Sequence, residues 1–573
     1  MKLLLRYLKP SYRTMSLGLS IKVAATLLEL MLPYILSYIL DSVVPMHSVP
    51  PILLWGGVMV LAAFGAFLGN LIANRIAARV ARDASRRIRH DLFEATMYLS
   101  AREADHYTIP SLESRLTSDT YNVHHFIGMM QRIGVRAPML LIGGMAITLF
   151  LDWRLALILL SVLPFIGFSV FMIARRGLPL YAKTQRSVDG MVRVVREDCQ
   201  GVRVMKALSQ ESYEKKRFDN ANRALVADER RAGMVMAASQ PVMSALLNLG
   251  LVAVIGIGAL FVNKGVSAPG RIIAFMQYFT LMSTAMSVIT RIFAQYSKCM
   301  ASAGRIGEVL DTYAAHREGT SAQKEVQADA PHIEFCDVSF SYNGRKNNLA
   351  NISFSLRRGQ TLGIIGATGS GKTTITQLLM RFYDVDAGSV RIDGVDVREM
   401  EERSLRARFG VVMQNDFIYA DTVAENIRFG REISDEQMHK AARIAQAEEF
   451  IMATPEGYGR ALCTKGTNLS GGQRQRVLIA RALAGEPEIL ILDDASSALD
   501  YRTDANLRTA IREELRATTV VVAQRVSSVM HADHILVLEN GCVIGSGRHA
   551  ELLESCDAYR EISRSQMGGA FLE

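Results

Sequence analysis

The chain has 573 residues, which is too long for a single hydrophobic core and predicts two to four domains. Apolar residues make up 49% of the sequence, so we expect membrane segments and exclude an ordinary soluble protein. The net charge of +9 is explained by Lys and Arg in the cytoplasmic segments of a membrane protein, so no nucleic-acid partner is expected. The six cysteines form no C-x-x-C pair and are predicted to be free thiols in a reducing compartment.

Six stretches of the first half are apolar and long enough to cross a bilayer, which takes about 20 residues each. A basic amphipathic segment precedes them at residues 1–13 and is interpreted as an interfacial helix. The stretches cover about 17–40, 52–73, a third ending at Leu151, a fourth starting at Leu155, a fifth within 232–263, and about 272–292.

The connections between these stretches alternate between short and long. The long ones, about 75–136 and 175–231, are rich in Arg and in helix formers, so helices are predicted to continue well beyond the membrane. Their Arg content places them in the cytoplasm, together with both termini, and a bacterial-type plasma (inner) membrane is expected. Five polar residues fall inside the stretches, where they either line a substrate cavity or form interhelical hydrogen bonds: Lys22, Glu29, Asn70, Gln240 and Asn248.

After residue 311 the composition changes. Residues 312–331 are polar and lack an apolar period, as expected of a linker, and 332–340 alternate like a strand. The predicted organisation is a transmembrane domain over 1–311, the linker, and a soluble α/β domain over 332–573. The fold class is therefore a membrane all-α domain followed by an α/β P-loop domain.

A phosphate-binding loop of the form G-x-x-x-x-G-K-[ST] lies in the soluble half. A predicted strand, 361–365, precedes the loop, and a predicted helix, 374–382, follows it. Lys372 is expected to contact the β- and γ-phosphates of ATP, and the Thr373 hydroxyl to bind Mg²⁺. The predicted nucleotide-binding residues of this segment are Gly366, Thr368, Gly369, Ser370, Gly371, Lys372, Thr373 and Thr374.

Two further motifs follow at spacings that suit the same chemistry. A buried-strand run, 488–494, ends in two carboxylates, of which Asp493 is the predicted Mg²⁺ ligand, acting through water. The segment Leu469-Ser470-Gly471-Gly472-Gln473 leads into a predicted helix, 474–483, whose N-terminus suits phosphate. A simple helix cap is the alternative for this segment.

With these motifs, the chain resembles a half-transporter of the ATP-binding cassette (ABC) exporter family over nearly its whole length. The resemblance implies that Tyr342 stacks on adenine, that Gln414 senses Mg²⁺ and the γ-phosphate, and that Asp500 belongs to a loop crossing a dimer interface. It also implies two cytoplasmic coupling helices, around 108–116 and 204–212. Members of the family are dimers that hold ATP between one subunit's phosphate loop and the other's LSGGQ signature.

Two positions depart from the family pattern. Asp494 stands where the family has the Glu that polarises the attacking water, and Gln524 stands where it has a switch histidine. Shortening a carboxylate by one methylene withdraws it by about 1 Å, a misplacement that can cost about 10²-fold in rate. An amide can hydrogen-bond a phosphate but cannot carry a proton. Tolerated drift in a working site is the alternative interpretation.

An intact signature beside these changes favours one subunit of a heterodimeric exporter, paired with a homologous second half-transporter in the lipid membrane. Its own site is then slow and retains ATP. A homodimeric lipid or drug flippase is the first alternative, and an ATP-gated channel or regulator the second. The Met-rich, weakly charged membrane half suits hydrophobic, amphipathic or cationic substrates.

Overall fold

The computed structural model describes residues 2–317 and 330–567. The chain divides into two compact units, one comprising Met1–Met97 and Pro110–Thr312, and the other Tyr98–Ile109 and Tyr313–Glu573. The last helix of the membrane unit, α11 (Pro269–Arg317), continues into the segment predicted as a linker. Residues 318–329 of that predicted linker lie outside the described residues.

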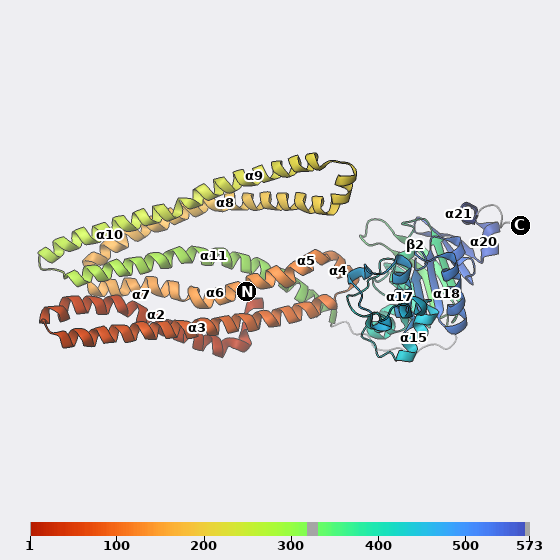
Figure 1. Cartoon of the computed structure of the whole chain (residues 1–573), viewed down its shortest axis with the longest axis horizontal. Helices are drawn as coiled ribbons and strands as arrows, with labels where there is room; N and C mark the ends of the chain where they lie inside the picture. The colour runs from red at the N-terminus through yellow and green to blue at the C-terminus, as the bar shows by residue number, and fades with distance from the viewer. Residues whose placement is uncertain (1, 318–329, 568–573) are drawn as a thin grey trace. The chain divides into compact units, whose positions relative to one another are not determined.

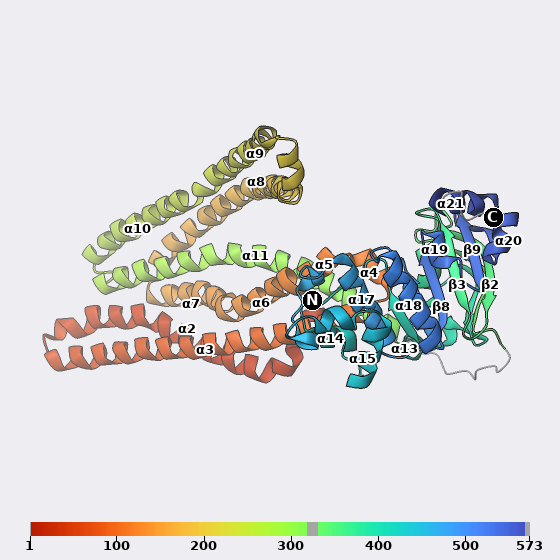
Figure 2. The same cartoon turned by 45° about the vertical axis from the view of Figure 1, so that its right-hand side comes forward.

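The membrane unit is built almost entirely from long helices (Figure 1). After α1 (Lys2–Leu8), the main ones are α2 (Tyr12–Tyr38), α3 (Val49–Met97), α6 (Thr120–Met129), α7 (Arg136–Leu151), α8 (Trp153–Ala207), α9 (Glu211–Ala237), α10 (Ser239–Asn263) and α11. The short helix α5 (Ile109–Ser114) precedes α6, and single π-helical turns, Arg115–Asp119 and Met130–Gly134, flank α6. Figures 1 and 2 both show α2, α3, α6, α7 and α11 running side by side, and α8 paired with α9.

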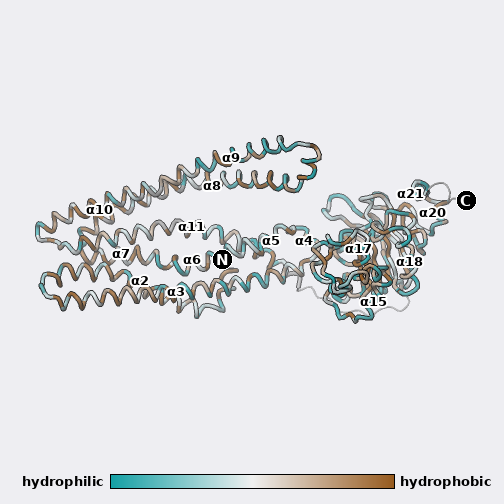
Figure 3. Tube along the Cα trace, in the orientation of Figure 1, coloured by the Kyte–Doolittle hydropathy of each residue, from teal (hydrophilic) through white to brown (hydrophobic). Residues whose placement is uncertain are grey.

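Five helical segments are long and apolar enough to cross a membrane. They are Leu3–Met46, Val49–Met97, Ile109–Leu151, Trp153–Ala207 and Ser244–Asn263, found among the described residues only. The sixth predicted stretch, about 272–292, lies on α11 but is not among these five. Figure 3 shows hydrophobic residues along α10 and the adjoining part of α8, and hydrophilic residues where α8 turns into α9.

The turn between α7 and α8 illustrates how local sequence places a helix boundary. Asp152 is extended, with φ −159° and ψ 102°, and its carboxylate accepts a hydrogen bond from the Arg154 N–H. This N-cap satisfies a backbone donor at the start of α8 that has no partner within the helix. The predicted short hairpin over 152–154 is therefore a one-residue break between two long helices.

The second unit contains two sheets. A four-stranded antiparallel sheet has the order β2-β1-β4-β5, and a six-stranded sheet has the order β10-β9-β3-β8-β7-β6. The strands are β1 (Ile333–Phe340), β2 (Leu349–Leu356), β3 (Thr361–Gly366), β4 (Ala387–Ile392), β5 (Val395–Asp396), β6 (Phe409–Val412), β7 (Ile489–Asp493), β8 (Thr518–Ala523), β9 (His534–Glu539) and β10 (Cys542–Gly547).

The parallel centre of the six-stranded sheet positions the nucleotide site. Strands β3, β7 and β8 are apolar runs buried on both faces, as central parallel strands must be. Their register pairs Ile365 with Ala523 and Asp493 with Val522, so the three strands end at the same edge. Ligands of open parallel sheets bind outside this carboxyl edge.

Helices complete the unit around these sheets. Those used below are α4 (Ala101–Tyr107), α12 (Lys372–Leu379), α17 (Gly471–Leu483), α18 (Tyr501–Glu514), α19 (Val526–Val529) and α21 (Asp557–Met567).

Candidate nucleotide site

The phosphate loop connects β3 directly to α12, and its glycines have conformational reasons to be there. Gly371 has φ +100°, and a Cβ on it would lie 3.0 Å from the Asn348 carbonyl oxygen and 2.6 Å from Leu349. A Cβ on Gly366 would lie 2.1 Å from the Leu538 carbonyl oxygen. Only glycine fits both positions, so the backbone can turn tightly and present its N–H groups beside the start of α12.

Lys372 and Ser370 fit a phosphate group in this loop. The Lys372 ammonium donates hydrogen bonds to the carbonyl oxygens of Gly366 (2.9 Å) and Ala367 (2.8 Å), so its charge lies over the loop. Burial lowers the pKa of Lys372, while the nearby carboxylates of Asp493 and Asp494 oppose this shift. The Ser370 hydroxyl is buried without a hydrogen-bond partner among the described residues. A bound phosphate would accept hydrogen bonds from both the Lys372 ammonium and the Ser370 hydroxyl.

Thr373 and Asp493 form a pair suited to Mg²⁺. Asp493, at the end of β7, is only 4% exposed, and the Thr373 side chain hydrogen-bonds to it. Burial raises the pKa of Asp493, and the hydrogen bond from Thr373 opposes this rise. Mg²⁺ prefers oxygen ligands and is commonly held by one or two protein groups plus nucleotide phosphates. The hydroxyl and carboxylate meet that requirement, and bound Mg²⁺ would neutralise phosphate charge here.

Asp494 occupies a constrained backbone position. Its φ is +54°, in the left-handed region, and its N–H donates to the Val522 carbonyl oxygen (2.8 Å). Asp tolerates this region better than most non-glycine residues. Burial raises the pKa of the Asp494 carboxyl, whereas Lys372 and Arg525 lower it. The carboxylate is thus on a fixed backbone beside two cations.

One cleft of about 270 Å³ gathers half of the predicted nucleotide-binding residues together with the predicted catalytic and Mg²⁺-binding residues, while Gly366 and Ser370 of the phosphate loop do not line it. Its lining includes Tyr342, Thr368, Gly369, Gly371, Lys372, Thr373, Thr374, Gln414, Asp493, Asp494 and Gln524. Asn348, Val522 and Ala523 also line it, and sequence reasoning did not include them. Segments more than 180 residues apart therefore meet at the sheet edge.

The signature residues and Asp500 do not line this cleft. Ser470 is the N-cap of α17, where its hydroxyl accepts from the Gln473 N–H (3.2 Å) and the Gln473 side chain accepts from the Ser470 N–H (3.0 Å). Asp500 likewise caps α18, accepting from the Thr503 N–H (2.9 Å). The helix-cap alternative considered for the signature thus describes its local geometry. Gly471 and Gly472 begin the same helix, so its N-terminus remains available to a phosphate.

Tyr342 and Tyr383 form an aromatic pair beside the phosphate loop, and only Tyr342 was predicted from the sequence. The Tyr342 hydroxyl donates to Gln377 Oε1 (2.5 Å) and also hydrogen-bonds with Thr374 Oγ1 (3.2 Å), and its ring meets Tyr383 edge-on, with 5.1 Å between the ring centres. The Tyr383 hydroxyl in turn donates to Asp105 of α4. A capping box between Ser100 and Glu103 starts this helix. Residues 98–109 of that loop belong to the same compact unit as the nucleotide site.

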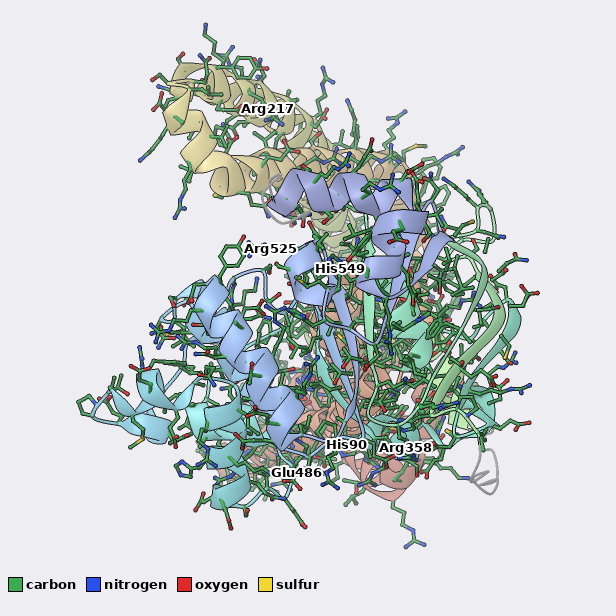
Figure 4. The ribbon with its side chains drawn as sticks, turned by 90° about the vertical axis from the view of Figure 1, so that its right-hand side faces the viewer. His90, Arg217, Arg358, Glu486, Arg525 and His549 are labelled. Atoms are coloured by element: carbon green, nitrogen blue, oxygen red, sulfur yellow. The ribbon has the colours of Figure 1, made fainter. Side chains whose placement is uncertain are left out.

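Gln566, in α21, contacts the loop after β8, and no sequence motif indicates it. Its side-chain amide donates to the Gln524 carbonyl oxygen (2.8 Å), and its oxygen accepts from the Val526 N–H (2.8 Å). Arg525, labelled in Figure 4, lies between these two positions in sequence, and its guanidinium is 5.6 Å from the centre of the Tyr501 ring. Hydrogen bonds from Gln566 of α21 therefore fix the position of the loop after β8.

The polar residues of the membrane helices largely pair with one another. Lys22 donates to Asn70 (2.6 Å), and Glu29 accepts two hydrogen bonds from Arg136. Asn248 is exposed on α10, and the Gln240 side chain lies outside what the structure describes. Of the two alternatives, interhelical hydrogen bonding therefore describes Lys22, Glu29 and Asn70.

The fold and the site together define a class: a membrane α-helical domain joined to a P-loop ATPase domain. The comparisons agree. The ABC transporter transmembrane region profile matches residues 15–286, and the ABC transporter profile matches residues 349–497. The chain therefore belongs to the ABC transporter family and is an ATPase-coupled transporter. Exporters of this family function as dimers.

Relatives extend over the whole chain. An uncharacterised ABC transporter ATP-binding protein, YfiB of Bacillus subtilis, is 33% identical over 98% of both chains. A multidrug efflux ATP-binding/permease protein of Mycobacterium bovis is 32% identical over 97% of this chain and 46% of that protein. The structure of a bacterial Atm1-family ABC exporter with ATP bound superposes with a TM-score of 0.81, at 24% identity, over 96% of this chain and 98% of the other. This last likeness establishes the exporter fold.

Proposed function

We propose that this chain is one subunit of a heterodimeric ABC exporter whose own ATP site is catalytically impaired. Its phosphate loop helps to form a slow, ATP-retaining site, and its signature completes the competent site on the partner. The observation that carries the proposal is that Asp494 and Gln524, the two departures from the family pattern, line the same cleft as Lys372.

The chemistry of these two residues supports an impaired site. A carboxylate about 1 Å too short cannot hold the attacking water at reacting distance. The left-handed backbone at Asp494 and the hydrogen bond from its N–H restrict movement that would compensate. Gln524 can bind the γ-phosphate but cannot take up a proton. We therefore assign weak hydrolysis to this site. ATP would still bind there through Lys372 and through Mg²⁺, which would be held by Thr373, Gln414 and Asp493.

The signature supports the second half of the proposal. Ser470, Gly471, Gly472 and Gln473 form a capped N-terminus on α17 away from the chain's own cleft. Such an N-terminus favours an anion approaching from another subunit. Asp500 and Tyr342 take the interface and adenine roles that the family resemblance implies.

The membrane half is assigned to export by alternating access. We assign it six spans, the sixth on α11, with both termini in the cytoplasm and a bacterial-type plasma membrane as its location. Residues 1–311 form the transmembrane domain and 332–573 the nucleotide-binding domain. The substrate is hydrophobic or amphipathic. A relative described as a multidrug efflux protein is consistent with this class.

A homodimeric flippase with sluggish turnover is the runner-up, and an ATP-gated channel is a more distant one. The first would hydrolyse ATP without any second chain. The second would show ATP-dependent conductance, whereas an exporter shows ATP-dependent uptake into inside-out vesicles.

The proposal is tested by measuring steady-state ATPase on the purified chain alone and after co-expression with a homologous partner carrying Glu and His at the two positions. We expect very slow hydrolysis by the chain alone and a strong increase in the complex. Brisk hydrolysis by a preparation shown to be a homodimer of this chain would contradict the proposal.

A further inference from the structure

A cavity of about 520 Å³ in the membrane unit is lined by four cationic side chains from three different parts of the bundle. Lys22 comes from α2, Arg132 from the π-helical turn after α6, Arg136 from the start of α7, and Lys298 from α11. Figures 1 and 2 show these helices side by side in the bundle. The nucleotide site does not involve this cavity.

Most of these cations lack a carboxylate partner. Of the four cations, only Arg136 forms an ion pair with an acidic residue among residues 2–317 and 330–567, and that residue is Glu29. Lys22 is only 3% exposed and is held by neutral oxygens of Asn70 (2.6 Å) and Asn74 (3.2 Å). Arg132 Nε donates to the carbonyl oxygen of Gly128 (3.1 Å). Arg136 and Arg132 repel the Lys22 ammonium, while Glu29 attracts it.

A further polar atom in this cavity is unsatisfied. His125, which lines the cavity, has a buried Nδ1 without a hydrogen-bond partner in the described part of the chain. Lys22 and the His125 Nδ1 are buried, whereas Arg132 and Lys298 are exposed and line the same cavity. A buried charge or an unfilled hydrogen-bonding atom is costly without a partner, and an anion in the cavity would offset the Lys22 charge and offer an oxygen to His125.

The cavity lies at one level of the proposed spans. Asn74 follows the second apolar stretch by one residue, Arg132 is near the start of the third, and Lys298 follows the sixth by six residues. The second stretch leads at this end into the Arg-rich segment that begins at Arg75. An excess of Lys and Arg marks the cytoplasmic side of a membrane protein, so this end of the spans is the cytoplasmic one. The cavity is therefore at the depth of the inner-leaflet headgroups, where basic pockets between helices bind anionic lipid headgroups.

The same helices also offer apolar surface. A second cavity, of about 450 Å³, is lined by Phe126 and Met130 from the α6 region, by Ile292 and Tyr296 from α11, and by Leu8 of α1. The α6 region, with the turn after it, and α11 thus line both cavities, with Arg132 and Lys298 at the first and apolar side chains at the second. Both surfaces that an amphiphile requires are present.

We infer that the four-cation cavity binds the oxyanion group of an anionic amphiphile, such as the phosphate of an inner-leaflet phospholipid. The inference rests on the proposed function and narrows its substrate class from hydrophobic or amphipathic to anionic amphipathic. It also replaces the expectation of a cationic substrate, because Lys22, Arg132 and Lys298 would repel such a molecule.

The test uses the full-length chain in nanodiscs and fluorescent phosphatidylglycerol as the probe, with phosphatidylcholine as the neutral comparison. The wild type should bind phosphatidylglycerol selectively. The double variant Arg132→Gln/Lys298→Gln should bind it at least about tenfold more weakly, because one charge-assisted hydrogen bond contributes about an order of magnitude in affinity. The matched control is Arg75→Gln/Arg79→Gln, which removes two exposed arginines that do not line the cavity.

Three results would overturn the inference: no preference for phosphatidylglycerol over phosphatidylcholine in the wild type, equal losses in both double variants, or unchanged affinity in the cavity variant. A competition arm with inorganic phosphate separates the two sources of the anion. Displacement of the lipid at a similar phosphate concentration would assign the cavity to a free anion and overturn the lipid assignment. Mg-ATP binding by each variant reports folding. Because lipid binding requires no hydrolysis, the outcome is independent of whether the ATP site is impaired.

Discussion

The side-chain amide of Gln566 donates a 2.8 Å hydrogen bond to the backbone carbonyl of Gln524, although the two residues are 42 positions apart. The other end of the same side chain accepts from the Val526 N–H. Gln566 therefore holds both sides of the loop that carries the position of the family's switch histidine. It acts as a positioning residue.

Gln566→Leu should shorten the time for which the assembled transporter retains labelled ATP in this subunit's site. Each lost neutral hydrogen bond contributes about 1 kcal/mol, so release about fivefold faster is expected for one bond and more for both. Gln566→Glu serves as the matched control, because it keeps the acceptor for Val526 and loses only the donor to Gln524. Its effect should be intermediate. Identical retention in all three proteins would show that the loop does not depend on α21.

Restoring the family pattern should restore chemistry. In the complex carrying Asp494→Glu and Gln524→His, trapping after a single turnover should reveal hydrolysis at two sites instead of one. The added methylene returns the carboxylate to reacting distance, and the imidazole can exchange a proton. Because Glu is less suited than Asp to φ +54°, the melting temperature must be measured alongside. A correctly folded complex that still hydrolyses only one ATP would show that the defect lies elsewhere in the site.

The signature should matter more to turnover than the nominal catalytic carboxylate. Asp494→Ala should lower steady-state ATPase of the complex only a few-fold. Gly471→Asp places a negative charge where the partner-bound γ-phosphate approaches, and two like charges about 4 Å apart repel by about 4 kcal/mol at an effective dielectric near 20. Losses of several hundredfold are expected, since each 1.4 kcal/mol is a factor of ten.

Gly471→Ala is the control for this comparison. A Cβ at Gly471 would lie 3.8 Å from the Ala498 side chain, which is ordinary contact distance, so a small side chain fits within the subunit. The Ala variant should therefore retain far more activity than the Asp variant. If Asp494→Ala were as damaging as Gly471→Asp at saturating Mg-ATP, this subunit's site would be a working one.

A buried histidine at the start of β1 should make the nucleotide unit sensitive to acid. His332 is 2% exposed, and burial lowers its pKa, although Asp393 opposes this. Below about pH 6.5 the unfolded chain binds a proton that the folded unit resists, so stability should fall by up to about 1.4 kcal/mol per pH unit. Thermal unfolding of the wild type and of His332→Gln between pH 7.5 and 5.5 should show a smaller decrease in the variant. Equal decreases would rule out this histidine as the source.

The surroundings of His332 argue against a metal there. Its ring, Asp393 and Glu488 are close enough to hold an ion. Both carboxylates, however, already accept hydrogen bonds from Arg408, and Arg358, labelled in Figure 4, donates to Asp393 (2.8 Å). Two guanidinium groups balance the two carboxylates and would repel a cation.

The sequence alone determined the features whose physical cause is local. The strand–loop–helix around Lys372 follows from glycines that permit a tight turn and an apolar run before them. Asp493 ends a buried strand, and the membrane stretches need only length and apolar composition. The phosphate loop, the strand end and five of the six stretches were predictable because the residues that matter are consecutive. The departures at Asp494 and Gln524 stay a prediction from the family resemblance.

Tertiary structure alone decided what depends on distant segments meeting. Nothing within α21 distinguishes Gln566 from any solvated glutamine until the chain brings it to β8. The bond from Tyr383 to Asp105 joins residues 278 positions apart. The sequence does not determine which way the Lys22 side chain points, because helical periodicity does not show which other helices pack against a given face. Only the packing of α2, α7, α11 and the turn after α6 brought separate basic residues into one cationic cavity, since electrostatic energy depends on distance in space and not on separation along the chain.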